Sequence, residues 1–123
     1  MTLVWLQDLR LNAEVSGPPG APPVVLIHGQ GLDLHLWDRL MPALSAHRVL
    51  RCDLRGHGAS DAPPAPYTLG ALIRDVERLI DHFALTDAVV VGQGEGGLIA
   101  QGLAVKRLDL VRALVLTGTA TRL

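Results

Sequence analysis

One stretch of the chain, residues 87–105, constrains the fold more than any other. Residues 88–91 form a short apolar and β-branched run, which predicts a buried strand. Four glycines follow within the six residues 92–97, and helical spacing of apolar residues resumes over 98–105. Because glycine permits backbone turns that other residues resist, the stretch predicts a strand, a sharp turn and a helix in direct succession.

This succession is the geometry of a nucleophile elbow, in which the motif G-x-S-x-G places a serine at the tip of the turn. The corresponding residues here are Gly92-Gln93-Gly94-Glu95-Gly96, so Gly94 stands at the serine position. Glycine has no hydroxyl, and no acyl-enzyme can form on it. The turn of a hydrolase is therefore predicted without its nucleophile. Glu95 is one residue out of register, which disfavours its carboxylate as a substitute.

The same glycines also fit G-x-G-x-x-G, the dinucleotide-binding fingerprint, and this remains a remote alternative. A dinucleotide site requires an acidic residue at the end of the next strand, to bind the ribose hydroxyls. The next predicted strand is followed by Thr117-Gly118 instead. The fingerprint also belongs near the start of such a domain, whereas three or four predicted strands precede it here.

The rest of the chain alternates predicted strands and helices. An antiparallel ribbon is expected at residues 3–6 and 9–15, with further strands at 24–27, 48–52 and 111–116. Helices are predicted at 32–44, with a kink at Pro42, and from Leu69 onward with Thr68 as N-cap. On the second helix Arg74, Asp75, Glu77, Arg78 and Asp81 are expected to face away from the apolar stripe. The pattern predicts one α/β domain over 1–123, a mostly parallel sheet with antiparallel N-terminal strands and about three main helices.

Four segments carry a resemblance to a known family. They are the strand ending in His28-Gly29-Gln30-Gly31, the loop 53–60 (DLRGHGAS), the helix from Leu69, and the glycine turn at 92–97. In this order they resemble the α/β-hydrolase superfamily over nearly the whole chain. Residues 58–68 and 97–104 look most like 3-oxoadipate enol-lactonases and related carboxylesterases. The resemblance implies a lineage that hydrolyses carboxylic esters or enol-lactones.

The resemblance also assigns roles to individual positions. It implies that the backbone N–H groups of Gln30 and Glu95 are the donors of an oxyanion hole, on either side of Gly94. It places four further residues around the substrate pocket: His28, Gly29, Gly31 and Trp37. It implies that Gly92 and Gly96 are small because the strand and the helix pass close to the turn.

In this family the acid and the histidine of the triad lie on later strands. The sequence ends after the strand that follows the elbow helix, so we expect a truncated N-terminal half that lacks the cap and both residues. Such a chain is expected to be inactive alone. The alternatives are a non-catalytic module that binds a small molecule, and half of a split hydrolase.

Composition narrows the classes of partner. A net charge of −1 gives no reason to expect nucleic acid, and no apolar run approaches the length of a membrane span. The first eight residues lack the pattern of a signal peptide, so a cytoplasmic location is expected. The single cysteine, Cys52, ends a predicted strand and is expected to be buried and unreactive.

The other polar candidates have structural interpretations. His28 is expected to end its strand, His57 to brace a loop, and Asp53 to accept hydrogen bonds within its own turn. His35, His47 and His82 lack the spacing of metal ligands, so neither a metal nor a cofactor is predicted.

The expected partners are a small ester or lactone and a protein surface. The strand from Val111 to Leu116 would be an exposed, apolar edge of the sheet. We expect it to mediate self-association or to bind a complementary C-terminal half.

Overall fold

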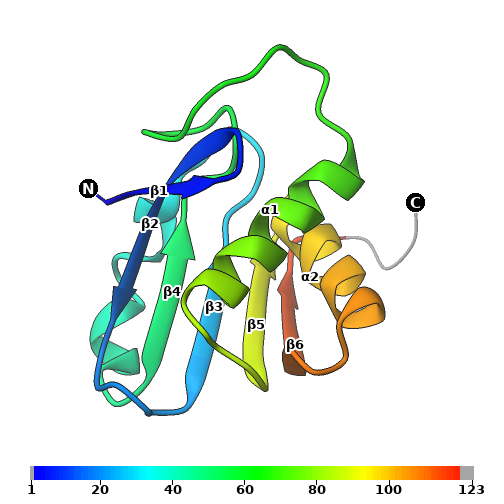
Figure 1. Cartoon of the computed structure of the whole chain (residues 1–123). Coiled ribbons are helices and arrows are strands. Elements are labelled where there is room, and N and C mark those ends of the chain that lie inside the picture. The colour runs from blue at the N-terminus through cyan, green and yellow to red at the C-terminus, as the bar shows by residue number, and fades with distance from the viewer. Residues whose placement is uncertain (1, 120–123) are drawn as a thin grey trace.

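The computed structural model describes residues 2–119 of the chain. Met1 and residues 120–123 lie outside the described part, and so does the chain end on which the predicted truncation rests. The described residues form one six-stranded sheet in the order β1-β2-β4-β3-β5-β6 (Figure 1). The strands are β1 (Leu3–Leu6), β2 (Leu9–Ser16), β3 (Pro23–Ile27), β4 (Arg48–Cys52), β5 (Ala88–Gln93) and β6 (Val111–Thr117).

The pairing confirms the predicted α/β class. β1, β2 and β4 pair antiparallel, whereas β4, β3, β5 and β6 run parallel. In the β3–β5 pair, Ile27 lies opposite Gly92. The two strands therefore end side by side, which brings the loop at residues 28–31 next to the glycine turn. Ligands of open α/β sheets bind at this carboxyl edge.

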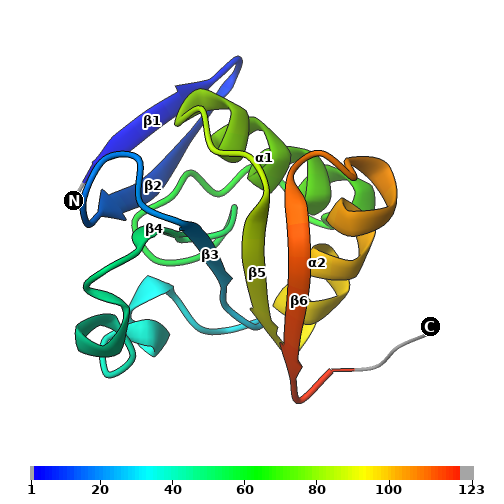
Figure 2. The ribbon, with the colours of Figure 1, turned by 90° about the horizontal axis from the view of Figure 1, so that it is seen from below.

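Two α-helices, α1 (Leu69–His82) and α2 (Glu95–Lys106), cover one face of the sheet (Figures 1 and 2). Their buried residues share the larger core with the strands, including Leu79 of α1 and Leu103 of α2. The spacing of apolar residues along α1 explains this packing. At the start of α1, the Thr68 side chain accepts a hydrogen bond from the N–H of Ala71 at 3.1 Å. The predicted N-cap is thus confirmed.

The predicted helix at 32–44 is wrong as a continuous element. The segment instead forms two 3-10 helices, η1 (Leu34–Trp37) and η2 (Met41–Leu44), so the described chain has two main helices rather than about three. Pro42 explains the break, because it lacks an amide hydrogen and is tolerated only at the start of a helix. Trp37 packs with Val24, Leu26 and Val49 in a separate cluster.

Asp75 corrects the predicted polar face of α1. Its side chain is only 1% exposed, and both carboxylate oxygens accept hydrogen bonds from Arg55, at 2.6 and 2.9 Å. A carboxylate is stable in such a position only when a charge partner compensates its lost hydration. Arg55 comes from the loop after β4, so this ion pair fixes that loop against α1.

β6 is the edge of the described sheet, because it pairs with β5 alone. Val115 on this strand is 50% exposed. Cys52, the last residue of the interior strand β4, is buried as predicted, and burial raises the pKa of its thiol to about 12. Within residues 2–119, no helix is long and apolar enough to cross a membrane.

Candidate active site

The glycine turn has the backbone of an elbow. β5 ends at Gln93 and α2 begins at Glu95, so the single residue Gly94 makes the turn between them. Its φ of 59° and ψ of −122° lie where residues with a side chain are strained. The predicted succession of strand, turn and helix is confirmed.

The three glycines of the motif differ in the space around them. A Cβ at Gly92 would overlap the backbone of Gly96 and Gly97, and one at Gly96 would overlap the carbonyl groups of Ile27 and His28. These two positions accept only glycine, as predicted. A Cβ at Gly94 would meet its nearest neighbour, Gly29 Cα, at an ordinary 3.7 Å. Position 94 therefore has room for a side chain that this sequence does not supply.

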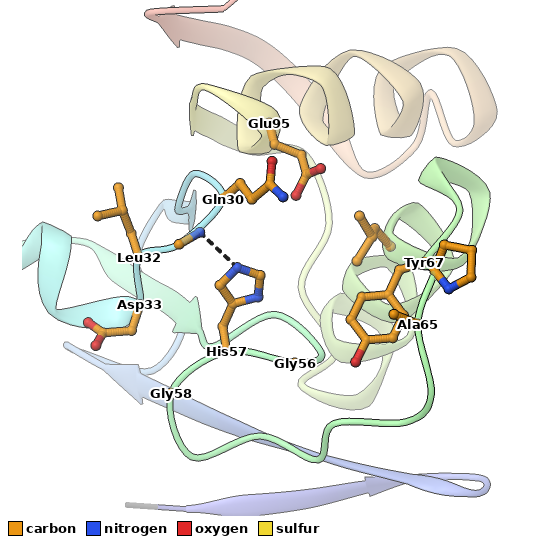
Figure 3. A pocket seen from close by; sticks show the side chains of 12 residues that line it. Gln30, Leu32, Asp33, Gly56, His57, Gly58, Ala65, Tyr67 and Glu95 are labelled. Carbon is orange, nitrogen blue, oxygen red and sulfur yellow. Dashed lines mark hydrogen bonds between the residues drawn. The ribbon is translucent and has the colours of Figure 1, made fainter.

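The loop after β3 forms the facing wall. The N–H of Leu32 donates to the carbonyl oxygen of Gly29 at 3.2 Å, and Gly31 has a φ of 80°. This is a β-turn whose third residue requires a positive φ, the type II arrangement. Gln30 and Glu95 come from different segments and line the same pocket side by side (Figure 3). Among the described residues, neither backbone N–H has a hydrogen-bond acceptor.

The pocket has a volume of about 680 Å³. Its walls come from the loops after β3 and β4 and from the starts of α1 and α2 (Figure 3). The lining residues are Gln30, Gly31, Leu32, Asp33, Gly56, His57, Gly58, Ala65, Pro66, Tyr67, Leu72 and Glu95. The N-terminus of α2 adds a positive partial charge to this site, which favours a carbonyl oxygen or an anion.

The structure brings together only some of the residues assigned to the pocket. Gly31, Gln30 and Glu95 line it. His28 is fully buried beneath the loop, Gly29 packs against Gln93, and Trp37 belongs to the cluster on β3 and β4. Neither these three residues nor Gly94 are among the lining residues.

Nine of the twelve lining residues were not assigned to the pocket from sequence, Tyr67 and His57 among them. Tyr67 donates its hydroxyl to the carbonyl oxygen of Pro63 at 2.6 Å, and the Arg55 guanidinium lies 5.8 Å from its ring centre. His57 was expected to brace a loop, and it also faces the pocket. The available signal was the position of both residues in the long loop between β4 and α1, since loops at the carboxyl edge line such sites.

Both histidines near the elbow have engaged ring nitrogens. His28 Nε2 accepts from the N–H of Leu54 at 3.0 Å, and its Nδ1 donates to the carbonyl oxygen of Gly29 at 2.7 Å. Burial is the main cause that lowers the pKa of His28, so the ring stays neutral. Its predicted structural role is confirmed. His57 Nε2 accepts from the N–H of Gly31 at 2.9 Å, and its Nδ1 donates to the carbonyl oxygen of Arg55 at 3.0 Å.

Asp53 joins three segments beneath the pocket. Its carboxylate accepts hydrogen bonds from the N–H of Ala59 at 2.9 Å, the N–H of Leu34 at 2.8 Å and Asn12 Nδ2 at 2.9 Å. Burial alone would raise the pKa of this carboxyl, but the three hydrogen bonds outweigh it and the pKa is lowered. The predicted bond within its own turn is confirmed, and the bonds to β2 and η1 extend it.

The dinucleotide-binding alternative finds no support in the glycine turn or in β6. Packing against backbone explains Gly92 and Gly96 without a dinucleotide, and β6 ends at Thr117 without an acid. Within the part of the chain that the structure describes, no three His, Cys, Asp or Glu side chains are grouped as metal ligands.

Comparison with known proteins identifies the family. Residues 22–123 match the family model described as the alpha/beta hydrolase fold. The chain belongs to this family.

Its similar proteins include enzymes named for esters and lactones. The chain is 30% identical over 118 residues to 3-oxoadipate enol-lactonase 2 of Acinetobacter baylyi, covering 95% of this chain and 44% of that protein. It is 43% identical over 116 residues to a pimeloyl-[acyl-carrier protein] methyl ester esterase of Neisseria meningitidis, covering 93% and 43%. The crystal structure of an enol-lactonase from Burkholderia xenovorans superposes with a TM-score of 0.93 at 36% identity, covering 98% of this chain and 48% of that one. The chain thus spans less than half of the length of each.

Proposed function

We propose that this chain carries the elbow side of an ester or lactone site, which binds a carbonyl substrate but cannot form an acyl-enzyme at position 94. The observation that carries the proposal is Gly94 itself. Its backbone has the strained elbow conformation, and the space around it would accept a side chain. The similarity to an enol-lactonase and a methyl ester esterase supports this substrate class.

The chemistry follows from the groups around Gly94. A carbonyl oxygen placed between the N–H groups of Gln30 and Glu95 would receive two hydrogen bonds and the field of the α2 terminus. Both donors are otherwise unused among the described residues. Attack on the carbonyl requires a nucleophile and a base. Gly94 supplies no nucleophile, and the ring nitrogens of His28 and His57 are already engaged.

Amide NMR tests the binding step. We expect γ-butyrolactone and methyl butyrate to shift the backbone amide signals of Gln30 and Glu95 in a saturable way. Gly94→Leu would fill the space above Gly29 and abolish the shifts. Gly20→Leu is the matched control, because Gly20 also has a positive φ (83°) and open surroundings but lies in the loop between β2 and β3, outside the glycine turn.

Saturable shifts that map elsewhere, or none with either probe, would contradict the proposed site. Shifts at Gln30 and Glu95 that survive in Gly94→Leu would show that the ligand does not occupy the space at the elbow.

A second proposal concerns the edge at β6. We propose that this edge pairs with a strand from a hydrolase segment that continues the sheet, in the same polypeptide or in another. β6 exposes one side of its backbone, and Val115 is 50% exposed. Each cited relative is more than twice as long as the region it shares with this chain.

Sedimentation velocity tests the second proposal. The chain is mixed with the separately produced C-terminal segment of the Acinetobacter baylyi enol-lactonase, and a one-to-one complex is expected. Val115→Lys, which places a charge on the exposed face, should prevent it. A chain that forms a stable dimer with itself, or that ignores the segment, would contradict this occupant.

A further inference from the structure

One hydrogen bond joins the loop at residues 28–31 to a different loop of the pocket. The N–H of Gly31 donates to Nε2 of His57 at 2.9 Å (dashed line in Figure 3). The two residues come from different loops, after β3 and after β4. The imidazole therefore joins the two walls of the pocket at the residue next to Gln30.

The hydrogen bonds define the state of the ring. The carbonyl oxygen of Arg55 can only accept, so Nδ1 of His57 carries the proton. Nε2 is then an unprotonated acceptor, which matches its bond from Gly31. Hydrogen bonds at both ring nitrogens fix the orientation of the ring. The neighbouring His28 ring, with its centre 5.0 Å away, has the same tautomer.

The bonded N–H belongs to the central peptide of the β-turn at 29–32. In a trans peptide the N–H and the C=O point in opposite directions. While the Gly31 N–H points at His57, the Gln30 carbonyl oxygen points away from it. Types I and II of this turn differ by a flip of that central peptide, and Gly31, with its φ of 80°, lies in the type II state. A flip would turn the Gln30 carbonyl oxygen toward His57 and the pocket, where it would repel a substrate oxygen.

We propose that His57 is a positioning residue that holds the Gln30–Gly31 peptide in the orientation that an oxyanion hole needs. This inference rests on the proposed function, because it assigns His57 to the same carbonyl-binding site.

The charged and titratable groups around His57 come from every wall of the pocket. Asp33 and Glu95 line the same cavity, and Asp53 lies beneath the adjacent Gly58. His28 is beside the ring, Tyr67 lines the facing wall, and Arg55 is bound to Asp75. The test therefore needs a variant that removes the His57 ring and leaves these groups in place.

The test compares His57→Leu with His57→Gln. Leucine has a similar bulk and no acceptor, whereas the Gln carbonyl oxygen reaches as far from the backbone as Nε2 does. His35→Leu is the control, since His35 is exposed on η1 and bonds only Asp38 and Asp33. All variants are first compared by thermal melting.

Two readouts separate the inference from the proposed function. The first is the Gly31 amide signal without ligand. We expect His57→Leu to move it upfield and speed its exchange with solvent at least tenfold, and His57→Gln to retain most of the wild-type behaviour. The second is the Kd for γ-butyrolactone, expected to rise about 2- to 10-fold in His57→Leu, the range of one lost neutral hydrogen bond.

An unchanged Gly31 amide in His57→Leu would overturn the inference whether or not the lactone binds. A changed amide with an unchanged Kd would equally overturn it, because the loop would then move without affecting the site. If the wild-type protein binds no lactone, the proposed function fails, and an altered Gly31 amide would leave His57 as a loop brace only. If His57→Leu does not fold, the wild-type protein decides, since an NMR coupling between the Gly31 and His57 Nε2 nitrogens is expected across the bond and its absence would contradict the bond.

Discussion

Alanine at each of the three elbow glycines should have sharply unequal effects on stability. At Gly94 the added Cβ finds ordinary space, so the cost is that of a positive φ, about 1–2 kcal/mol. At Gly92 and Gly96 the Cβ would lie closer than 3.0 Å to backbone atoms of neighbouring elements. Those atoms belong to hydrogen-bonded strands and a helix terminus and cannot give way cheaply. We expect each of these substitutions to cost more than about 4 kcal/mol, a large part of the stability of a small domain.

Urea denaturation followed by circular dichroism measures these differences. Gly70→Ala is the matched control, because Gly70 lies in α1 with open surroundings, and alanine there should stabilise by about 0.5 kcal/mol. The reasoning would be refuted if Gly94→Ala were as damaging as Gly96→Ala. It would also be refuted if Gly96→Ala were as harmless as the control, because the strand and the helix would then not meet at the turn.

Three further predictions concern the groups that hold the pocket. Asp75→Ala should reduce the free energy of unfolding by about 2–4 kcal/mol, and Asp75→Asn should reduce it less. The cost is below that of breaking a fully buried pair, because the Arg55 side chain is 18% exposed. Asp53→Asn should cost about 1–3 kcal/mol at neutral pH, since an amide cannot accept from all three donors. The folded-state pKa of Asp53 is lowered, so its contribution to the free energy of unfolding is present above the unfolded pKa of about 3.9 and is lost as the pH falls through the folded value. Below about pH 4, the free energy of unfolding should therefore fall less steeply with pH in Asp53→Asn than in the wild type. Thr68→Ala should lower the melting temperature through loss of the α1 cap, by the equivalent of about 1 kcal/mol, whereas Thr86→Ala, outside any cap, should change it little.

The fold could be predicted from sequence largely because the spacing of apolar residues along a strand or a helix is a local signal. Strand β4 was expected at 48–52 and is found there, and the helix from Leu69 begins as predicted. The segment 32–44 could not be resolved in this way. Its apolar spacing suits one α-helix and two 3-10 turns alike, and Pro42, at the start of η2, excludes the continuous helix.

The site was predictable only where the chain is continuous. The elbow is one uninterrupted stretch, so its strand, turn and helix could be identified from residues 87–105. The bond from Gly31 to His57 joins residues 26 apart, and the Arg55–Asp75 pair joins residues 20 apart. Asp75 falls on the polar side of the helical pattern, and no local signal shows that a loop covers it.

Gly94→Cys tests most directly whether position 94 is a nucleophile position without a nucleophile. Cysteine needs no histidine to be nucleophilic, and a helix N-terminus lowers the pKa of a thiol. With p-nitrophenyl butyrate we predict a burst of about one p-nitrophenolate per chain, at least tenfold faster than with the control Gly20→Cys, and an acyl group located at position 94 by peptide mass spectrometry. Cys52 serves as an internal reference, because its buried thiol should stay unmodified. Equal rates for the two variants, or acylation that does not map to position 94, would contradict the claim.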